Sequence, residues 1–226
     1  TAIALKERKP TIAIALADGI SSSEVSQVAA QSAVTSLLDD YYCTSDAWSV
    51  KTSAERVLVA TNSWLHAQTQ QSRHRHDMER GYVCTLSAVV LKSRTAHLFH
   101  VGDTRIYLLR DGALTQVTKD HSYVQEQVDA GLLTPEQARY HPYSNVITRC
   151  VGASDEVEAD IYAGAMKPGD VFLVASDGLT GMVDDRRLQP PGWERHAAPR
   201  IAAQTDMSIY ELHVRDFSIN DASVPL

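Results

Sequence analysis

The sequence predicts an α+β fold in which two helices are followed by a set of short antiparallel strands. Three observations support this prediction. Apolar residues recur at helical spacing beyond residue 24, and between residues 84 and 118 the chain divides into short segments rich in Val, Leu, Thr and Tyr. In addition, two continuously apolar runs each end at an Asp-Gly pair, which is typical of a buried strand that stops at a turn.

The first elements are predicted to be a strand, an acidic turn and two helices. The apolar run 11–17 (TIAIALA) is the strand, and Ser21 with Glu24 has the spacing of a capping box that opens the first helix. Thr52 with Glu55 has the same spacing and is predicted to open the second helix. The apolar side of the first helix is formed by Val25, Val28, Ala29, Ala33 and Leu37.

The middle of the chain is predicted to form an antiparallel meander, because its strand-like segments are separated only by short turns. Asp111-Gly112 separates two of these segments and is a strong hairpin signal. Residues 121–150 are predicted to be helical and irregular, with a helix start at Thr134-Pro135, where proline takes the first helical position. The predicted strands are 84–91, 96–101, 104–109, 114–118, 157–163 and 171–176.

Composition limits the classes of function. The chain of 226 residues suits one domain with or without an appendage, and its net charge of −7 disfavours nucleic acid or an anionic membrane as a partner. Its apolar runs are far shorter than the ~20 residues of a membrane-spanning helix, and its first basic residues follow an apolar stretch, unlike a signal peptide. Three widely spaced cysteines, Cys43, Cys84 and Cys150, indicate neither a disulfide framework nor a zinc site, so we expect reduced thiols in a cytoplasmic protein.

Acidic residues at strand ends suggest a chemistry. Asp18-Gly19 and Asp177-Gly178 follow the two apolar runs, and another predicted strand leads into Gly102-Asp103. A carboxylate at a strand end is held rigidly and faces an opening, while glycine lets the backbone approach a ligand closely. Oxygen ligands of this kind suit Mg²⁺ or Mn²⁺, which activate water and neutralise phosphoryl charge. Each Asp-Gly pair on its own is more often an ordinary turn.

Three stretches of the chain, taken in order, resemble a known family. They are LADGISSSEVSQVAAQSAV, LFHVGDTRIYLLRDGALTQVTKDHS and KPGDVFLVASDGLTGMV, and they are similar to bacterial metal-dependent protein phosphatases of the PPM (type 2C) family. The resemblance covers residues 11–185, and its three motifs occur in the family's order and spacing. It implies a sandwich of two antiparallel β-sheets flanked by helices, with metal ions at one end.

The same resemblance implies roles for four residues. Asp18 would bridge two Mn²⁺ or Mg²⁺ ions, the Gly19 carbonyl would bind one of them and Asp177 the other. Asp103 with Asp177 would match a third metal position. The water shared by the two ions would attack phosphorus, which makes Asp18 and Asp177 the catalytic pair, and no substrate-binding residue is assigned. Residues 121–148 match a flap beside the cleft that influences substrate choice.

The resemblance is incomplete at both ends, and so is the predicted sandwich. The family's first strand carries a phosphate-binding Arg and a metal-binding Glu or Asp, and Glu7 and Arg8 do not match that motif. The family's last strand carries an Asp-Asn pair, which the reversed Asn220-Asp221 does not match. The phosphatase-like domain is therefore assigned to residues 1–185, without the first and last metal-ligand strands.

Residues 190–226 instead resemble part of the pullulanase-type starch-debranching enzymes, around YELHVRDFS. A single strand of that barrel does not make a glycosidase, which needs two carboxylates across a sugar-binding cleft. We therefore expect a chimeric chain in which residues 186–226 are a linker, centred on 189–200, and a foreign tail with one strand at 208–217. Strand edges left uncovered in such a chain would allow a homodimer.

The predicted function is weak, metal-dependent hydrolysis of phosphate monoesters, either phosphoserine and phosphothreonine in proteins or small aryl phosphates. Three carboxylates carry less negative charge than two divalent ions carry positive charge, so we expect low metal affinity. The alternative is a catalytically silent scaffold without a complete metal site. A third hypothesis is a regulatory module that binds phosphoprotein through the flap without turnover.

Three positions near these motifs have competing interpretations. Arg105 shares a sheet face with Asp103 by strand alternation, and we expect it to hold Asp103 in place rather than bind phosphate. His100 is expected to pack in the core rather than face the cleft. Asp120-His121 is expected to cap the flap rather than transfer a proton.

Overall fold

The computed structural model describes residues 1–8, 11–20, 24–73, 75, 77 and 80–181. The predictions made for Ser21, for the linker, for the tail and for Asn220-Asp221 lie outside these residues. The strands are β1 (Ala2–Arg8), β2 (Thr11–Ala17), β3 (Leu86–Lys92), β4 (Thr95–Val101), β5 (Arg105–Arg110), β6 (Ala113–Gln116), β7 (Asp160–Ala165) and β8 (Val171–Ala175). The helices are α1 (Glu24–Cys43), α2 (Val50–Gln71), α3 (Tyr123–Asp129), α4 (Pro135–Arg139) and α5 (Asp177–Thr180).

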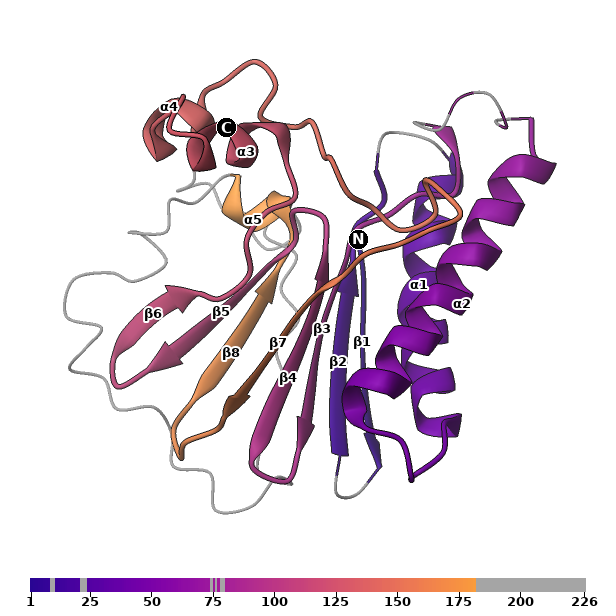
Figure 1. Cartoon of the computed structure of the whole chain (residues 1–226), viewed down its shortest axis with the longest axis vertical. Helices are drawn as coiled ribbons and strands as arrows, with labels where there is room; N and C mark the ends of the chain where they lie inside the picture. The colour runs from indigo at the N-terminus through magenta and orange to yellow at the C-terminus, as the bar shows by residue number, and fades with distance from the viewer. Residues whose placement is uncertain (9–10, 21–23, 74, 76, 78–79, 182–226) are drawn as a thin grey trace, which may run out of the picture.

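Two antiparallel sheets form a sandwich, with α1 and α2 packed along the larger sheet (Figure 1). The larger sheet has the order β1-β2-β3-β4-β7 and the smaller sheet has the order β6-β5-β8. The predicted α+β fold of two antiparallel sheets flanked by helices is confirmed. The predicted single meander is wrong, because β3 and β4 belong to one sheet and β5 and β6 to the other. The chain crosses between the sheets at residues 102–104, and this crossing is where Asp103 lies.

Strand β1 is an element that the sequence analysis did not predict. It pairs with β2 along its whole length, from Ala2 opposite Ala17 to Arg8 opposite Thr11. Its alanine-rich sequence has weak strand propensity, and pairing with the strongly apolar β2 compensates for that weakness. Arg8 therefore lies at the hairpin end of the pair, and Asp18 lies at the opposite end.

Helix α2 begins earlier than predicted. Its N-cap is Ser49, whose hydroxyl accepts a hydrogen bond from the Thr52 N–H (3.0 Å). The predicted start at Thr52 is therefore wrong. Glu55 does not close a capping box there, and its carboxylate lies 3.8 Å from the ammonium group of Lys51 one turn earlier.

Two predicted turn signals are confirmed. Asp111 and Gly112 both have positive φ angles (52° and 80°), as a tight hairpin turn requires. Thr134 is the N-cap of α4, Pro135 takes the first helical position, and the Gln137 side chain completes a capping box. In both places a local interaction within four residues decides the structure, so the sequence was sufficient.

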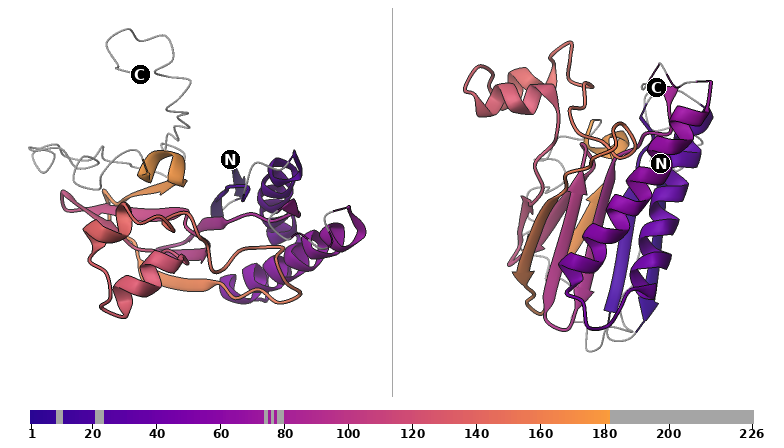
Figure 2. Two further views of the ribbon diagram at one scale, coloured as in Figure 1. Left: turned by 90° about the horizontal axis from the view of Figure 1, so that it is seen from above. Right: turned by 45° about the vertical axis from the view of Figure 1, so that its right-hand side comes forward.

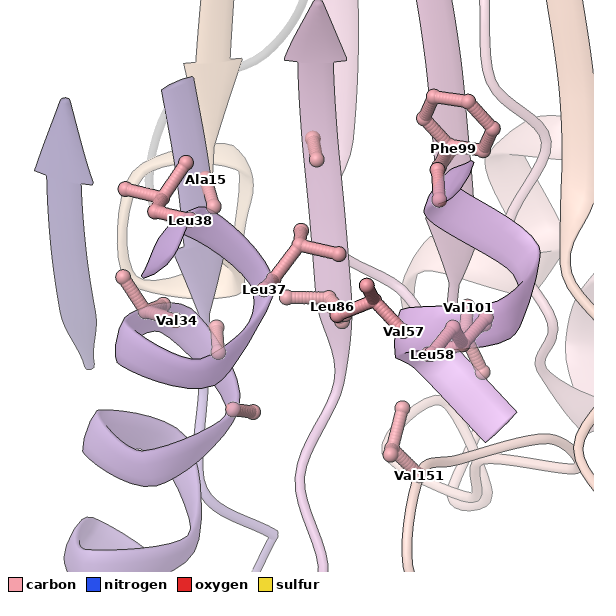
Figure 3. Packing of buried hydrophobic residues seen from close by; sticks show 14 of the residues in the cluster. Ala15, Val34, Leu37, Leu38, Val57, Leu58, Leu86, Phe99, Val101 and Val151 are labelled. Atoms are coloured by element: carbon pink, nitrogen blue, oxygen red, sulfur yellow. The ribbon is translucent and has the colours of Figure 1, made fainter. Parts of the chain in front are cut away.

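The core consists of two apolar layers on opposite faces of the larger sheet. One layer lies between the sheet and the two long helices, where Val34, Leu37 and Leu38 of α1 meet side chains of β2 and β3 (Figure 3). The other lies between the two sheets and includes Val89 and Ile106. Because both faces of the larger sheet are buried, β2 and β3 are continuously apolar instead of alternating.

Two further observations concern the sequence predictions on compartment. None of the helices in the described ranges has the length and apolar character needed to cross a bilayer. The three cysteines are free thiols, with Cys43 exposed, Cys84 buried and Cys150 half-buried.

Candidate active site

Asp18 follows β2, which runs toward the end of the molecule where α5 and the flap helices α3 and α4 lie (Figure 1). Two hydrogen bonds fix its backbone to Thr85. The Thr85 N–H donates to the Asp18 carbonyl (2.8 Å), and the Asp18 N–H donates to the Thr85 hydroxyl (3.1 Å). Its carboxylate oxygen Oδ1 lies 3.1 Å from the α-amino group of Thr1 and accepts a hydrogen bond from the Thr1 hydroxyl (2.9 Å).

Gly19 is packed closely against helix α1. A Cβ atom at this position would lie 2.6 Å from the carbonyl oxygen of Ser26 in the helix, so a side chain does not fit. Gly19 also forms an isolated β-bridge with Cys84. The backbone beyond Asp18 is therefore held between the helix and the residues that lead into β3, and a metal-binding carbonyl at Gly19 stays a prediction.

Asp103 lies in the turn that carries the chain from the larger to the smaller sheet. Gly102 before it has a φ of +108°, and a Cβ atom there would lie 2.5 Å from the Thr85 side chain. The pKa of the Asp103 carboxyl is raised to about 7. Burial is the largest cause, followed by the negative charges of Asp177 and Asp120.

Asp177 is the first residue of α5, directly after β8. Burial raises the pKa of its carboxyl, and so do the charge of Asp18 and a hydrogen bond between the two side chains. The Asp18 and Asp177 side chains, which come from distant parts of the chain, therefore lie close enough to affect each other's charge.

The structure thus brings together three carboxyl groups from distant parts of the chain. The three, Asp18, Asp103 and Asp177, act on one another electrostatically. Their chemistry suits a hard divalent cation, since each offers oxygen ligands and positive charge relieves their mutual repulsion. Their positions do not form a complete metal site, because the described residues contain no group of three or more Asp, Glu, His or Cys side chains placed to hold a metal ion.

The arginine beside the site has a different partner from the one expected. The guanidinium of Arg105 makes a forked pair with Asp120, with contacts of 2.7 to 3.0 Å. Its Nη1 also donates to the Tyr107 hydroxyl (3.3 Å). The expectation that Asp103 is the carboxylate gripped by Arg105 is therefore wrong. A planar carboxylate that reaches both edges of the guanidinium gives the stronger, bidentate interaction.

The two histidines of this region are structural in different ways. His100 is fully buried in β4, with Nδ1 2.9 Å from the Ser87 hydroxyl and Nε2 2.9 Å from the Lys119 carbonyl, so the expected packing role is confirmed. Asp120-His121 was expected to cap the flap, and it lies at the flap root, directly before the residue that caps the flap helix α3. The N-cap of α3 is Ser122, whose hydroxyl accepts from the Gln125 N–H (3.3 Å).

Thr85 is a residue of the site that the sequence analysis missed. Thr85 forms hydrogen bonds with the backbone of Asp18 and packs against Gly102. It therefore fixes the spacing between two of the three segments that carry the carboxylates. A signal was present, because Thr85 and Ser87 are polar residues two apart in an otherwise apolar run. Buried hydroxyls in such a run need hydrogen-bond partners, and the partner of the Thr85 hydroxyl is the Asp18 N–H.

Comparison with known proteins identifies the family. The family model described as protein phosphatase 2C matches residues 2–209. The chain belongs to the protein phosphatase 2C family. The match continues past residue 185, where the sequence analysis placed the end of the phosphatase-like domain, into the segment that resembles debranching enzymes. The domain boundary and the chimeric tail stay predictions.

Two relatives of this protein phosphatase 2C chain are bacterial phosphatases. It is 34% identical over 181 residues to protein phosphatase PhpP of Streptococcus pneumoniae. That alignment covers 78% of this chain and 70% of PhpP. It is 38% identical over 177 residues to the serine/threonine protein phosphatase PstP of Mycobacterium tuberculosis, which covers 77% of this chain. The chain spans only 33% of the length of PstP.

A solved structure has the same fold. The catalytic domain of the serine/threonine protein phosphatase PstP in complex with two manganese ions superposes with a TM-score of 0.67 at 29% identity. The match covers 85% of this chain and 80% of that domain. The two-sheet arrangement predicted from the motifs is therefore that of a protein phosphatase 2C domain.

Proposed function

We propose that this chain hydrolyses phosphate monoesters, with phosphoserine and phosphothreonine in proteins as its substrates and Mn²⁺ or Mg²⁺ as its cofactor. The observation that supports the proposal most directly is the proximity of the Asp18 and Asp177 carboxyls, which interact electrostatically although they follow strands of different sheets. Two neighbouring carboxylates repel each other, and a divalent cation relieves that repulsion. A structure of a relative described as holding two manganese ions supports the same metal.

In this proposal each residue has a stated task. Asp18, the Gly19 carbonyl, Asp103 and Asp177 would hold the divalent ions, with Asp18 and Asp177 as the catalytic pair. When bound, divalent ions of this kind lower the pKa of water and neutralise phosphoryl charge. The chain's own contribution is to hold the carboxylates rigidly, through the Thr85 hydrogen bonds to Asp18 and through the turn at Gly102.

We propose that the activity is weak. The three carboxylates carry less charge than two divalent ions, and the described residues hold no ready three-ligand cage. Metal affinity then depends on rearrangement of Asp103 toward the other two carboxylates. The alternative is a catalytically silent scaffold that lacks a complete metal site.

Substrate, assembly and compartment are proposed on further grounds. The flap, residues 121–148, lies at the same end of the molecule as α5 in Figure 1 and in the right-hand view of Figure 2, which suits a surface that contacts a phosphoprotein. The outer edges of β1, β6, β7 and β8 end the two sheets within the described residues, which suits a homodimer formed through strand edges. The free cysteines suit a cytoplasmic protein.

A phosphatase assay tests the proposal. We expect hydrolysis of p-nitrophenyl phosphate and of a phosphothreonine peptide to require Mn²⁺, to stop with EDTA and to return when Mn²⁺ is restored. Asp18→Asn and Asp177→Asn should each lower kcat on the order of 10²-fold, since each removes charge from the reacting centre. Both should leave the thermal midpoint close to that of the wild type, because each relieves repulsion between neighbouring carboxyls and the ion pair of Asp18 with Thr1 is partly exposed to solvent.

Asp39→Asn is the matched control for this assay. Asp39 is an exposed carboxylate on α1 that contacts the ammonium group of Lys6 (2.7 Å), remote from the three site residues in the chain. It should keep the full Mn²⁺-dependent rate. A rate that does not respond to Mn²⁺, or that survives both site substitutions, would favour the silent scaffold.

A further inference from the structure

We infer that His121 is a positioning residue, which fixes Gly102 and thereby places the Asp103 carboxyl and connects it to the root of the flap. The inference rests on the proposed function, because it concerns a carboxylate of the same site. It adds a residue that the resemblance to phosphatases did not single out as part of the metal site. Its basis is a pair of hydrogen bonds between two buried residues 19 positions apart.

The two hydrogen bonds run in opposite directions. The Gly102 N–H donates to Nδ1 of His121 (3.0 Å), and the His121 N–H donates to the Gly102 carbonyl (2.7 Å). An accepting Nδ1 carries no proton, so the neutral imidazole holds its proton on Nε2. Both residues are buried, so loss of the ring acceptor would leave the Gly102 N–H without a partner or water.

The other end of the ring is held less well. Nε2 lies 3.3 Å from Oδ2 of Asp160, but the contact is too poorly aligned to count as a hydrogen bond. One face of the ring packs against His100, with centroids 4.7 Å apart and a tilt of 37°. Packing thus limits the position of the ring, and the bond to Gly102 sets its orientation.

Gly102 connects the orientation of the His121 ring to the position of Asp103. Its φ of +108° turns the chain from β4 toward β5, and Thr85 packs closely against its other side. Thr85 is in turn bonded to the backbone of Asp18. Gly102 is therefore held between Thr85 and His121, and Asp103 is the next residue.

His121 also closes the root of the flap. Its carbonyl accepts from the Thr148 N–H (2.9 Å), Ser122 forms a β-bridge with Ile147, and the Tyr123 N–H donates to the Val146 carbonyl (2.9 Å). The two ends of the flap therefore meet at the residue that holds Gly102. A displacement of the flap root would move Gly102 and change the position of the Asp103 carboxyl.

Two substitutions of His121 separate positioning from packing. His121→Phe keeps an aromatic ring beside His100 but has no acceptor for the Gly102 N–H. His121→Asn is smaller, but its side-chain oxygen is an acceptor at about the place of Nδ1. If positioning matters, the larger residue does the greater damage, which is the reverse of what packing alone predicts.

Calorimetric titration of the full chain with Mn²⁺ and hydrogen exchange without metal are the two measurements. We expect His121→Phe to weaken Mn²⁺ binding on the order of tenfold, as loss of an outer-shell partner does, and to speed exchange of the Gly102 amide. His121→Asn should stay close to wild type in both. In an Asp103→Asn background, His121→Phe should cause no additional loss of Mn²⁺ affinity.

The outcomes separate this inference from the proposed function. Equal damage by the two variants, or greater damage by His121→Asn, would show that His121 only fills space. Unchanged exchange at Gly102 in His121→Phe would likewise overturn the inference. A wild-type chain that binds no Mn²⁺ would overturn the proposed function, and exchange at Gly102, measured without metal, would still decide whether His121 holds that residue.

Discussion

The two sheets of the sandwich differ greatly in how well they are buried. In β3 of the larger sheet every residue but Lys92 is buried, whereas in β8 of the smaller sheet Ala175 alone is. Helices α1 and α2 cover the larger sheet, while the described helix that packs on β8 is the four-residue α5. Apolar burial is the main stabilising term in folding, so the larger sheet and its helices hold most of the stability of the described chain.

The candidate site joins these two unequal parts. Asp18 follows a strand of the larger sheet, Asp177 follows a strand of the smaller one, and Asp103 lies where the chain crosses between them. The geometry of the three carboxyls therefore depends on how the smaller sheet docks. A cation held between Asp18 and Asp177 would in return stabilise the docked smaller sheet, because a ligand that binds only the assembled state favours it.

The crossing itself should give the largest effect. Gly102→Ala places a methyl group 2.5 Å from Thr85 and forces an alanine to a φ of +108°. We expect a loss of about 3–5 kcal/mol from strain and overpacking together, measured as the free energy of unfolding in urea. Gly169→Ala is the matched control, since it has a φ of +90° but no atom within 4 Å of the new Cβ, and it should cost about 1 kcal/mol. Similar losses in the two variants would mean that close packing at the crossing contributes nothing.

Core truncations compare the two sheets directly. Leu37→Ala empties a buried position between α1 and the larger sheet (Figure 3) and should cost about 2–4 kcal/mol. Phe172→Ala in β8 removes a bigger side chain that is only partly buried, and it should cost about 1–2 kcal/mol in spite of its size. Urea denaturation of both variants checks the order. The reverse order would show that the smaller sheet is the better packed part.

The sequence was sufficient where a local signal decides the structure, and insufficient where distant segments meet. The strand-end positions of Asp18, Asp103 and Asp177 followed from the apolar runs before them, and the structure brings the three together. The N-cap of α2 was misplaced because Ser49 and Thr52 both carry a hydroxyl that can cap a helix. Only the extended backbone of Ser49 shows that it is the cap. The division of the meander into two sheets depends on the crossing at Gly102, a residue that packs against Thr85 from a distant part of the chain.

Arg105 illustrates the same limit. Alternation placed it correctly near the site, but the choice between Asp103 and Asp120 depends on how the residues after β6 fold back toward β5. Strand β1 was missed for a related reason, since its weak propensity is compensated only by pairing with β2. Residues that connect the carboxylate segments, such as Thr85 and His121, act through backbone contacts that no spacing motif records.

Acid should weaken the seam between the two sheets gradually, in contrast to the substitutions above. His100 is fully buried there, and burial, then the nearby charge of His121, lowers its pKa to about 4. In the unfolded chain its pKa returns to the ordinary value of about 6.5. Between these values His100 binds more protons in the unfolded state than in the folded state, so the contribution of His100 to stability is complete above about pH 6.5 and falls as the pH is lowered toward 4, by up to about 1.4 kcal/mol per pH unit.

The test is the pH dependence of urea unfolding with EDTA present, which removes any contribution from bound metal. His100→Gln should be less stable than wild type at pH 7 and should lose less additional stability between pH 6.5 and 5. His97 lies on the same strand and is only partly buried, although burial lowers its pKa as well. His97→Gln should therefore change the pH dependence of stability less than His100→Gln does. If the stability of His100→Gln falls with decreasing pH as steeply as that of the wild type, the groups responsible lie elsewhere, and protonation at the seam between the sheets does not explain the loss.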